Sequence, residues 1–529
     1  MIGVLASPSE HEIVREFFEL FKTPWEFHRL HGRYEVVLCA QDIGMAELSN
    51  YAAGLVVIYS GRRLSLDENA GVESRKHGGE ACILQCGEFR IPVYGEHLLF
   101  GDGPVRESPP CATHFSELAG RKMVRVGYDL FSEIRTLLTT GQPKSNAAIP
   151  TLDLHISLLR DMIIGSGVTL VEIPPVPNGY RFIACLTHDV DHPMIRRHKF
   201  DRTMFGFLYR ATFGSILKAF RGRMAWRDVW RNSAAALKLP LVHLGRVKDY
   251  WCELDQYVAM EAGARSSFFV IPFAGRPGMT ATGTAPSARA ARYGAFDISS
   301  QIERLTFAGC EIGLHGIDAW VDSCKAKNEL DEIRKIAGLQ EVGVRMHWLY
   351  FDEHSPMVLE QAGASYDSTV GYNETIGYRA GTTQAYAPPG TSHLIELPLH
   401  VMDTALFFPG HLGLSSEEAR TRVRQMIDNA VRFGGCLTVN WHDRSIAPER
   451  LWGEFYVSLV AELEAQGAWL ATAGHAVSWF RKRRAANIEN IRQQSGGLDG
   501  QIANQSPDDL PGLHLSVHRG RKQCQESSI

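Results

Sequence analysis

The stretch RFIACLTHDVDH, residues 181–192, decides the fold of the larger part of this chain of 529 residues. It opens with a short apolar run of the kind that is buried in parallel sheets. It ends in polar residues, among them Asp189 and Asp191. In a β/α barrel the carboxyl ends of the strands meet at one face, where active sites form. The stretch therefore predicts a buried strand that carries an acidic pair to such a face.

Apolar runs of the same kind recur along the chain and alternate with helical patterns. After the first stretch they are SSFFVIPF, CEIGLH, GVRMHWLYF, SYDSTVGY, LIELPLHV, CLTVNWH and AWLATA. Helical segments such as SEEARTRVRQMIDNAVRF, residues 416–433, separate most of them. This alternation predicts an α/β fold, with a distorted (β/α) barrel of seven or eight units over residues 180–484. A doubly wound open sheet is the alternative.

Residues 1–172 predict a separate N-terminal α/β domain. Their strand-like runs begin at residues 35, 54, 81 and 123, and no glycine-rich phosphate loop or catalytic cluster accompanies them. We therefore expect an accessory domain. Three prolines and an Asn-Gly pair mark residues 172–180 as a linker. Residues 485–529 are polar, which is typical of a flexible tail or of the remnant of a small β module.

The composition is that of a soluble globular protein, with 45% apolar and 22% charged residues and a formal net charge of -4. This balance favours neither nucleic acid nor an anionic membrane as a partner of the whole chain. The first residues lack a basic stretch followed by an apolar core, and no apolar run reaches the roughly 18–20 residues of a membrane helix. Ten cysteines without a C-x-x-C pair argue against a disulfide framework. We expect a cytoplasmic protein.

The acidic pair itself suggests a metal ion. Asp189 and Asp191 are two residues apart on an extended strand end, so their side chains point to the same side. Two carboxylates this close repel each other unless one of them binds a cation or a proton. A divalent metal ion held by Asp191 and His315 would leave Asp189 free as a base. Alternatively, the pair lies at the surface and caps the following helix.

Other predicted strands also end in polar residues. Any one of these residues fits a strand that simply stops, but together they predict a single site at the barrel face. The residues are His315, Arg345, His347, Asp367, His442 and Asp443.

The order of these motifs resembles the NodB-homology polysaccharide deacetylases, carbohydrate esterase family four in the broad sense. The matching stretches are THDVD, EIGLH, RMHWL, YDSTVGY with GYRAGT, and LTVNWHD, over about residues 181–480. The first motif reads HDVD, as in an uncharacterised branch of the family, where better-known members read TFDDG. The resemblance implies a distorted barrel and a divalent metal ion held by Asp and His.

The resemblance also implies a role for each matching residue. Asp189 matches the catalytic base, and Asp191 matches the metal-binding acid, displaced by one position. His315 matches the first metal-binding histidine. Arg345 matches the arginine that orients the base, and His442 matches the general acid.

One metal ligand of the family is missing. The second metal-binding histidine would fall four residues after His315, where this chain has Ala319. Asp318 is the expected substitute as an oxygen ligand, and His192 and His347 are the other candidates. An Asp-His site suits zinc, and cobalt, manganese and nickel are the alternative divalent ions.

The expected chemistry is the hydrolysis of an amide. The metal ion polarises the carbonyl and acidifies a water, from which Asp189 removes a proton. His442 then protonates the leaving amine, and Asp443 or Asp403 orients His442.

Three further residues are expected to bind the sugar. Arg379, in GYRAGT, either lines the pocket or closes its own loop by hydrogen bonds. Tyr372 and Trp441 stand near strand ends, where aromatic rings stack on sugar faces, although a single ring is more often part of the core.

Residues 196–238 form a basic insertion after the first motif, with eleven Lys or Arg against two Asp. Phe, Tyr, Trp and Leu are interleaved with these charges. One interpretation is a solvated helix pair beside the barrel. The others are a lid over an anionic saccharide and a peripheral contact with the inner membrane face. No nucleic-acid-binding module accompanies the insertion, so we expect no nucleic-acid partner.

The sequence thus predicts a metal-dependent hydrolase that removes an N-acetyl or other acyl group from an amino sugar or saccharide precursor, in surface-polysaccharide synthesis. A hydrolase of a small non-sugar amide is one alternative. A non-catalytic carbohydrate-binding relative that has lost a metal ligand is the other. The sequence does not predict the oligomeric state.

Overall fold

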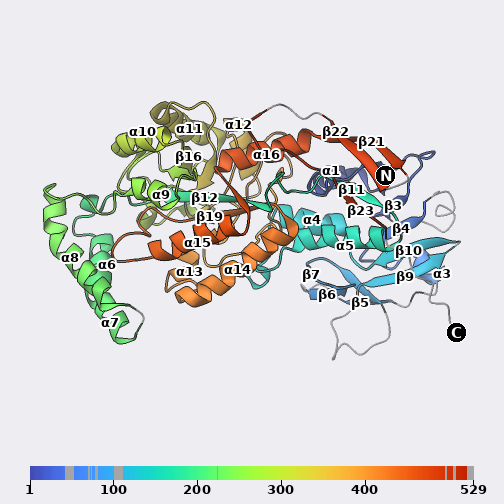
Figure 1. The fold of residues 1–529 in the computed structure, drawn as a ribbon, viewed down its shortest axis with the longest axis horizontal. Helices are drawn as coiled ribbons and strands as arrows, with labels where there is room; N and C mark the ends of the chain where they lie inside the picture. The colour runs from blue at the N-terminus through green and yellow to red at the C-terminus, as the bar shows by residue number, and fades with distance from the viewer. Residues whose placement is uncertain are drawn as a thin grey trace. The chain divides into compact units, whose positions relative to one another are not determined.

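The computed structural model describes residues 1–41, 53–69, 72, 74–77, 82–100, 111–118, 120–222, 224–494, 497–503 and 508–520 (Figure 1). The chain divides into two compact units. Unit 1 consists of Met1–Gly179, Tyr378–Pro389 and Trp479–Ile529, and unit 2 consists of Tyr180–Gly377 and Gly390–Ser478. Residues 378–389 and 479–484, which the sequence analysis assigned to the barrel region, therefore belong to unit 1.

Unit 1 contains a six-stranded sheet in the order β2-β1-β3-β4-β10-β9, in which β9 alone is antiparallel to its neighbour. The runs from residues 35, 54 and 123 form β3, β4 and β10, as predicted, and every residue of β3 and β4 is buried. The bounds are β1 (Ile2–Leu5), β2 (Trp25–Phe27), β3 (Val36–Cys39), β4 (Leu55–Tyr59), β9 (Thr113–Leu118) and β10 (Arg121–Val126). The helices of this unit include α1 (His11–Leu20), α3 (Ser65–Asn69), α4 (Leu130–Leu138) and α5 (Thr151–Gly165).

The run that begins at residue 81 does not join this sheet. It forms β6 (Cys82–Cys86), which pairs with β7 (Phe89–Val93) in an antiparallel hairpin. Leu84 and Cys86 are fully buried while the other side chains of β6 are partly exposed. This one-sided burial suits an antiparallel hairpin rather than a central parallel strand. A second antiparallel pair joins β5 (Ser74–His77) to β8 (His97–Phe100).

The end of the chain contains strands. Its described residues contain two strands that form a hairpin, β21 (Asn487–Gln494) and β22 (Gly497–Ala503). A third strand, β23 (Ser516–His518), pairs with β11 (Leu170–Glu172). Helix α16 (Ala473–Ala485) precedes this segment.

Unit 2 contains a curled parallel sheet in the order β17-β16-β13-β12-β19-β18, and β20 pairs with the first half of β12. All nine residues of β12 are buried, in keeping with the apolar run that opens the deciding stretch. The bounds are β12 (Phe182–Val190), β13 (Ser267–Val270), β16 (Glu311–Gly316), β17 (Val344–Met346), β18 (Val401–Met402), β19 (Cys436–Asn440) and β20 (Ala468–Ala471). The count of seven or eight barrel strands stays a prediction.

The fifth predicted strand, SYDSTVGY, forms an isolated bridge in place of a strand. Asp367 pairs in parallel with Val344 of β17 on one side and with Glu396 on the other. The Asp367 carboxylate accepts hydrogen bonds from the backbone N–H of Ser368, at 2.8 Å, and from the Thr369 hydroxyl. Such local side-chain hydrogen bonds compete with a regular ladder.

Helices connect most of these strands, and capping residues mark where the helices begin and end. Helix α11 (Ser323–Ala337), for example, begins after Asp322, whose side chain accepts a hydrogen bond from the Lys325 N–H. It ends at Gly338 in the left-handed conformation, which glycine adopts without strain. The others include α9 (Leu254–Met260), α10 (Ser299–Phe307), α12 (Ser355–Ala362), α13 (Asp403–Phe407), α14 (Ser416–Phe433) and α15 (Gly453–Ala465).

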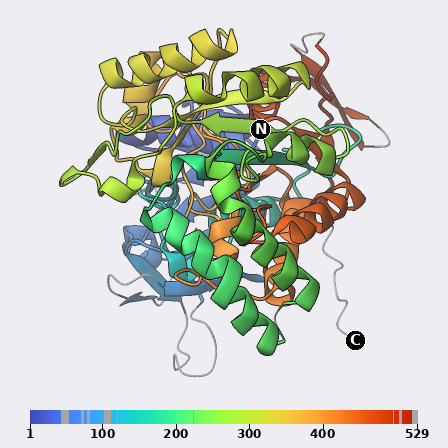
Figure 2. The same ribbon diagram turned by 90° about the vertical axis from the view of Figure 1, so that its left-hand side faces the viewer.

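The basic insertion is helical, as one interpretation expected. It contains α6 (Arg202–Tyr209), a π-helical turn (Arg210–Gly214), α7 (Ser215–Phe220) and α8 (Trp226–His243). These helices are drawn in green and face the viewer in Figure 2. Within the described part of the chain, no helix combines the length and the apolar character needed to cross a bilayer.

Candidate active site

Parallel register brings the polar strand ends of unit 2 together. On the edge shared by β12 and β19, Thr187 lies opposite Asn440. On the edge shared by β16 and β17, His315 lies opposite Arg345. Because these strands belong to one parallel sheet, their carboxyl ends deliver the predicted residues to the same region.

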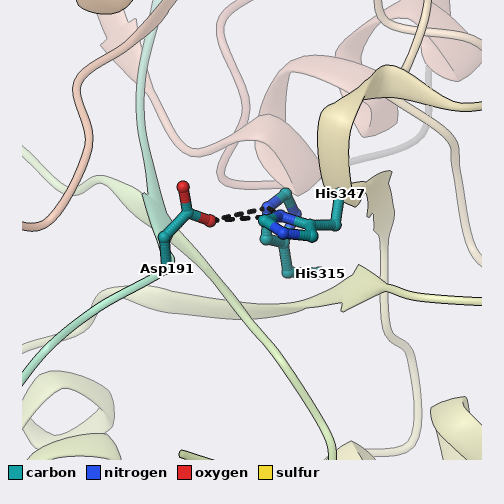
Figure 3. Close-up of side chains that lie close together, drawn as sticks. All are labelled: Asp191, His315 and His347. Atoms are coloured by element: carbon teal, nitrogen blue, oxygen red, sulfur yellow. Dashed lines mark hydrogen bonds and ion pairs between the residues drawn. The ribbon is translucent and has the colours of Figure 1, made fainter. Parts of the chain in front are cut away.

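Asp191, His315 and His347 converge on one point (Figure 3). Asp191 Oδ1 lies 3.2 Å from His315 Nε2 and 3.2 Å from His347 Nδ1. The two nitrogens are 3.0 Å apart. Each residue thus offers one ligand atom, and the three atoms lie within reach of a single metal ion.

The other hydrogen bonds of the two histidines show that these nitrogens carry no proton when the rings are neutral. His315 Nδ1 lies 3.0 Å from the Arg345 carbonyl oxygen, and His347 Nε2 lies 3.1 Å from the Arg289 carbonyl oxygen. A carbonyl oxygen only accepts, so each of those nitrogens must be the protonated one. The nitrogens that face Asp191 are then bare lone pairs, and Asp191 Oδ1 also has no hydrogen-bond partner among the described residues. Three converging lone pairs are able to hold one metal ion, and imidazoles oriented by carbonyl oxygens are typical metal ligands.

Asp191 is ionised. Burial raises its pKa, but His347, His315 and His442 in their protonated forms lower it by more, so the pKa lies well below the ordinary value. A permanent carboxylate beside two bare imidazole nitrogens fits a divalent cation such as zinc.

Asp189 is buried next to this group and is held by different partners. Arg345 Nη1 donates to its Oδ1 at 3.1 Å, and Asn440 Nδ2 donates to its Oδ2 at 2.7 Å. Burial raises the pKa of Asp189, but Arg345 and then His315 lower it below the ordinary value. Asp189 is therefore a carboxylate, and its Oδ2 lies 3.9 Å from His315 Nε2.

Arg345 is fully buried and fixes Asp189 in place. Its Nη1 also donates to Thr187 Oγ1 at 2.7 Å, and its Nη2 donates to Ser368 Oγ at 2.8 Å. The guanidinium carbon lies 4.5 Å from the centre of the Phe269 ring. A planar cation held on several sides is a rigid support for a carboxylate.

His442 lies beside the converging group. Its Nδ1 lies 2.6 Å from Asp403 Oδ1, and its Nε2 lies 3.8 Å from Asp191 Oδ2. Burial lowers the pKa of His442, but Asp403 and then Asp191 raise it, to about 9. Of the two predicted partners of His442, the structure brings Asp403 into contact. The Asp443 carboxylate instead accepts the backbone N–H of His192 at 2.8 Å.

A cavity of about 460 Å³ opens over these side chains. The predicted base Asp189, the predicted acid His442 and the three converging residues line it, together with aromatic rings and two arginines, whereas Arg345 and Asp443 do not. The lining residues other than Asp189, Asp191, His315, His347 and His442 include His192, Trp348, Leu349, Tyr350, Asn373, Met402, Thr404, Phe408, His411, Arg444 and Arg450.

None of the three expected sugar-binding residues lies in this lining. Trp441 is fully buried and stacks on Phe455 at a centroid distance of 5.8 Å, so it belongs to the core. Side chains alternate along an extended segment, and its neighbour His442 takes the side that faces the cavity. Tyr372 is almost completely buried, and Arg379 lies in the segment that belongs to unit 1.

Asp318 was expected as the third metal ligand, and the structure places it elsewhere. Its Oδ1 accepts the backbone N–H of Met279 at 2.7 Å, outside the converging group. The turn after β16 explains this, because the N–H groups of Ile317 and Asp318 both donate to the Glu329 carboxylate. His347, one of the other candidates, contributes the third atom of the converging group.

Two functional residues were not singled out from the sequence. Asn440, which lies within the last motif, donates a hydrogen bond to Asp189. Arg450 lines the cavity with a buried Nη1 that has no hydrogen-bond partner among the described residues. Strand alternation places Asn440 and His442 on the same side, which was an available signal for the first of them.

No protein-family model matches the chain, and no curated protein matches it. Among solved structures, a provisionally named polysaccharide deacetylase of Mycobacterium smegmatis is 20% identical, with a TM-score of 0.35, and the alignment covers 61% of this chain and 100% of that one. A "probable polysaccharide deacetylase" of Pseudomonas aeruginosa PAO1 is 12% identical, with a TM-score of 0.36, and the coverage is 59% and 94%. The family 4 carbohydrate esterase PdaA of Bacillus subtilis is 13% identical, with a TM-score of 0.28, and the coverage is 57% and 84%. The solved structures that this chain is similar to thus include polysaccharide deacetylases of carbohydrate esterase family four, the family that its motifs resemble.

Proposed function

We propose that unit 2 is a metal-dependent hydrolase that removes an N-acetyl or other acyl group from an amino sugar or saccharide precursor. One observation carries the proposal. A three-residue ligand group (Asp191, His315 and His347), a separate ionised Asp189 and a protonated His442 line the same cavity. Metal-assisted amide hydrolysis needs a metal site, a general base and a general acid, and these residues suit the three roles.

The residues divide the chemistry between them. A divalent ion held by the ligand group supplies a Lewis acid that polarises the amide carbonyl and acidifies water. Asp189, deprotonated and fixed by Arg345, accepts the proton of the attacking water. His442, protonated and oriented by Asp403, donates a proton to the leaving nitrogen. Zinc suits one carboxylate and two imidazoles, with cobalt, manganese or nickel as alternative ions.

A saccharide suits the lining of the cavity. Trp348 and Tyr350 offer rings on which a sugar face can stack, while Asn373 and Thr404 offer polar groups for its hydroxyls. A small non-sugar amide is the second candidate substrate, because nothing in the ligand group depends on the rest of the substrate. The non-catalytic alternative rested on Ala319 in place of a metal ligand. The position of His347 Nδ1 beside Asp191 Oδ1 and His315 Nε2 supports a three-residue ligand group and so favours the hydrolase.

Acetate release tests the proposal. We expect the purified protein, loaded with Zn, Co, Mn or Ni in separate samples, to release acetate from N-acetylated amino sugars, and chelation to abolish the release. Faster release from simple N-acetyl amides than from any sugar would support the second candidate. Metal at stoichiometric occupancy without release from any compound would contradict a hydrolase of acetyl groups.

The pH dependence should report the His442–Asp403 pair. The protonated form of His442 exists below its raised pKa, so a rate that needs this proton is lost as the pH rises through that pKa. Because Asp403 is the first cause of the raised pKa, Asp403→Asn should move this alkaline limb to lower pH. The measurement is the pH profile of kcat/KM. Asp443→Asn is the matched control, since Asp443 makes no hydrogen bond to the His442 ring, and an equal shift in both variants would contradict the assignment.

A further inference from the structure

Residues 199–247 of unit 2 contain most of the basic insertion and the rest of α8, and we call them the helical insertion. They expose an unusual number of large apolar side chains. Thirteen of the exposed large apolar residues of the described chain fall within the helical insertion. Isolated exposed apolar residues are ordinary, but a contiguous group marks an interaction surface. We propose that this insertion docks the protein peripherally on a bilayer that contains anionic lipid.

Helix α8 carries one half of the surface. Trp226, Trp230, Leu237 and Leu241 are 52%, 76%, 82% and 40% exposed. They are spaced by four, seven and four residues, so at 3.6 residues per turn they form one stripe along the helix. The stripe is therefore a continuous apolar face that unit 2 does not cover.

The segment from α6 to α7 carries the other half in the same pattern. Phe205, Tyr209, Phe213 and Phe220 are all exposed, at spacings of four, four and seven residues. The rings of Phe220 and Trp226 meet edge to face at 5.3 Å, which joins this stripe to that of α8 at the turn between the helices. We call these eight residues the outer stripe.

The outer stripe is not needed for the packing of the insertion itself. The opposite faces of the same helices hold a separate buried cluster that includes Met204, Phe207, Leu239 and Val242, packed with Trp251. These helices therefore have two apolar faces, one buried in unit 2 and one exposed. A helix that is stabilised on one side and apolar on the other is suited to a lipid interface.

Positive charge flanks the stripe. Residues 196–238 carry nine more positive than negative formal charges. On α8, Arg227, Arg231 and Lys238 lie beside the stripe and are exposed. Asp228 lies 3.7 Å from Arg231 and 3.9 Å from Arg227, and Glu454 of α15 lies 3.6 Å from Arg227. These two acids do not balance the nine excess positive charges of residues 196–238. Apolar rings flanked by lysine and arginine are the pattern by which interfacial helices bind anionic lipid.

The charge also argues against a second copy of the chain as the occupant. Self-association through the outer stripe would bring the flanking basic residues of two copies together, and like charges at an interface oppose binding. An anionic bilayer instead offers both an apolar interior and the opposite charge. The buried face of the insertion, and not the outer stripe, packs toward the candidate active site, because Trp251 contacts both Phe207 of α6 and the guanidinium of Arg444, which lines the cavity.

Vesicle co-sedimentation with the full chain tests the proposal. We expect the protein to pellet with vesicles of equimolar phosphatidylglycerol and phosphatidylcholine, and to bind pure phosphatidylcholine vesicles about ten-fold or more weakly. Raised salt should weaken the binding, since the charge contribution is screened. The variant Phe213→Ser/Trp230→Ser/Leu237→Ser should bind at least about ten-fold more weakly than the wild type.

A matched control exists in unit 2. Phe296 and Phe307 are 77% and 94% exposed and lie outside the insertion, so Phe296→Ser/Phe307→Ser should bind like the wild type. All substituted side chains are exposed, and unchanged thermal unfolding will verify that each variant is folded.

Failure of the wild type to bind either vesicle, or equal binding by the triple variant, would overturn the proposal. A dimer that the triple variant converts to a monomer, without vesicle binding, would assign the surface to self-association. Metal content and acetate release are independent readouts, so these outcomes do not depend on the proposed hydrolysis.

Discussion

His347→Ala is expected to abolish stoichiometric binding of a divalent metal ion and to reduce acetate release to the level of the chelated wild type. Among the described residues, His347 contributes one of the three converging ligand atoms, and its Nδ1 lies 3.2 Å from Asp191 Oδ1. Losing a residue that merely orients a ligand typically weakens metal binding by about 10–100-fold, so losing a ligand should cost at least that much. Metal analysis after dialysis and a competition titration with a chromophoric chelator would measure the change.

Asp318→Ala is the matched control for this prediction. Asp318 is the ligand that the sequence suggested, but its carboxylate accepts the Met279 N–H. Its removal should lower the free energy of unfolding by about 1–3 kcal/mol through the lost hydrogen bond, with the metal retained. If Asp318→Ala loses the metal and His347→Ala keeps it, the ligand group assigned here is wrong.

The contrast between Asp318 and His347 shows what the sequence could predict about the site. The motif spacing predicted a ligand four residues after His315. Because that residue is Ala319, the sequence analysis chose the nearest acid, Asp318, instead. Sequence spacing within a turn does not determine where a side chain points, and here the Glu329 carboxylate fixes the turn and directs Asp318 away. Strand alternation was the better guide, because it places His347 on the same side as Arg345.

The same reasoning explains the fold. Apolar runs such as those of β3, β4 and the first half of β12 were recognisable because both faces of a parallel strand are buried. The run at residue 81 and the stretch SYDSTVGY were harder, because hairpin pairing and local side-chain hydrogen bonds decide their structure. Residues 378–389 belong to unit 1 because of contacts between residues that are far apart in the sequence. One is the Leu152 N–H donating to the Gly381 carbonyl at 2.8 Å. No local pattern encodes such a contact.

Asp189→Asn is expected to separate catalysis from metal binding. The substitution keeps the shape of the side chain but removes its ability to accept a proton, and loss of a general base typically costs 10²–10⁴-fold in rate, as an order of magnitude. Asp191, His315 and His347 are unchanged, so the metal content should stay at the wild-type level. Turnover of the metal-loaded variant, measured by acetate release, should therefore fall by about this factor.

Stability must be measured beside turnover, because Asp189 also pairs with a buried cation. Breaking a buried ion pair costs about 3–5 kcal/mol when the remaining charge is left alone. Arg345 keeps its hydrogen bonds to Thr187 and Ser368, and Asn440 remains beside the new amide, so the cost here should be smaller than that. A folded, metal-loaded variant with near wild-type turnover would show that Asp189 is not the base. A folded variant that has lost its metal would show that Asp189 is a ligand instead. Only a folded protein that keeps its metal and loses its turnover agrees with a base held by Arg345 beside the metal site.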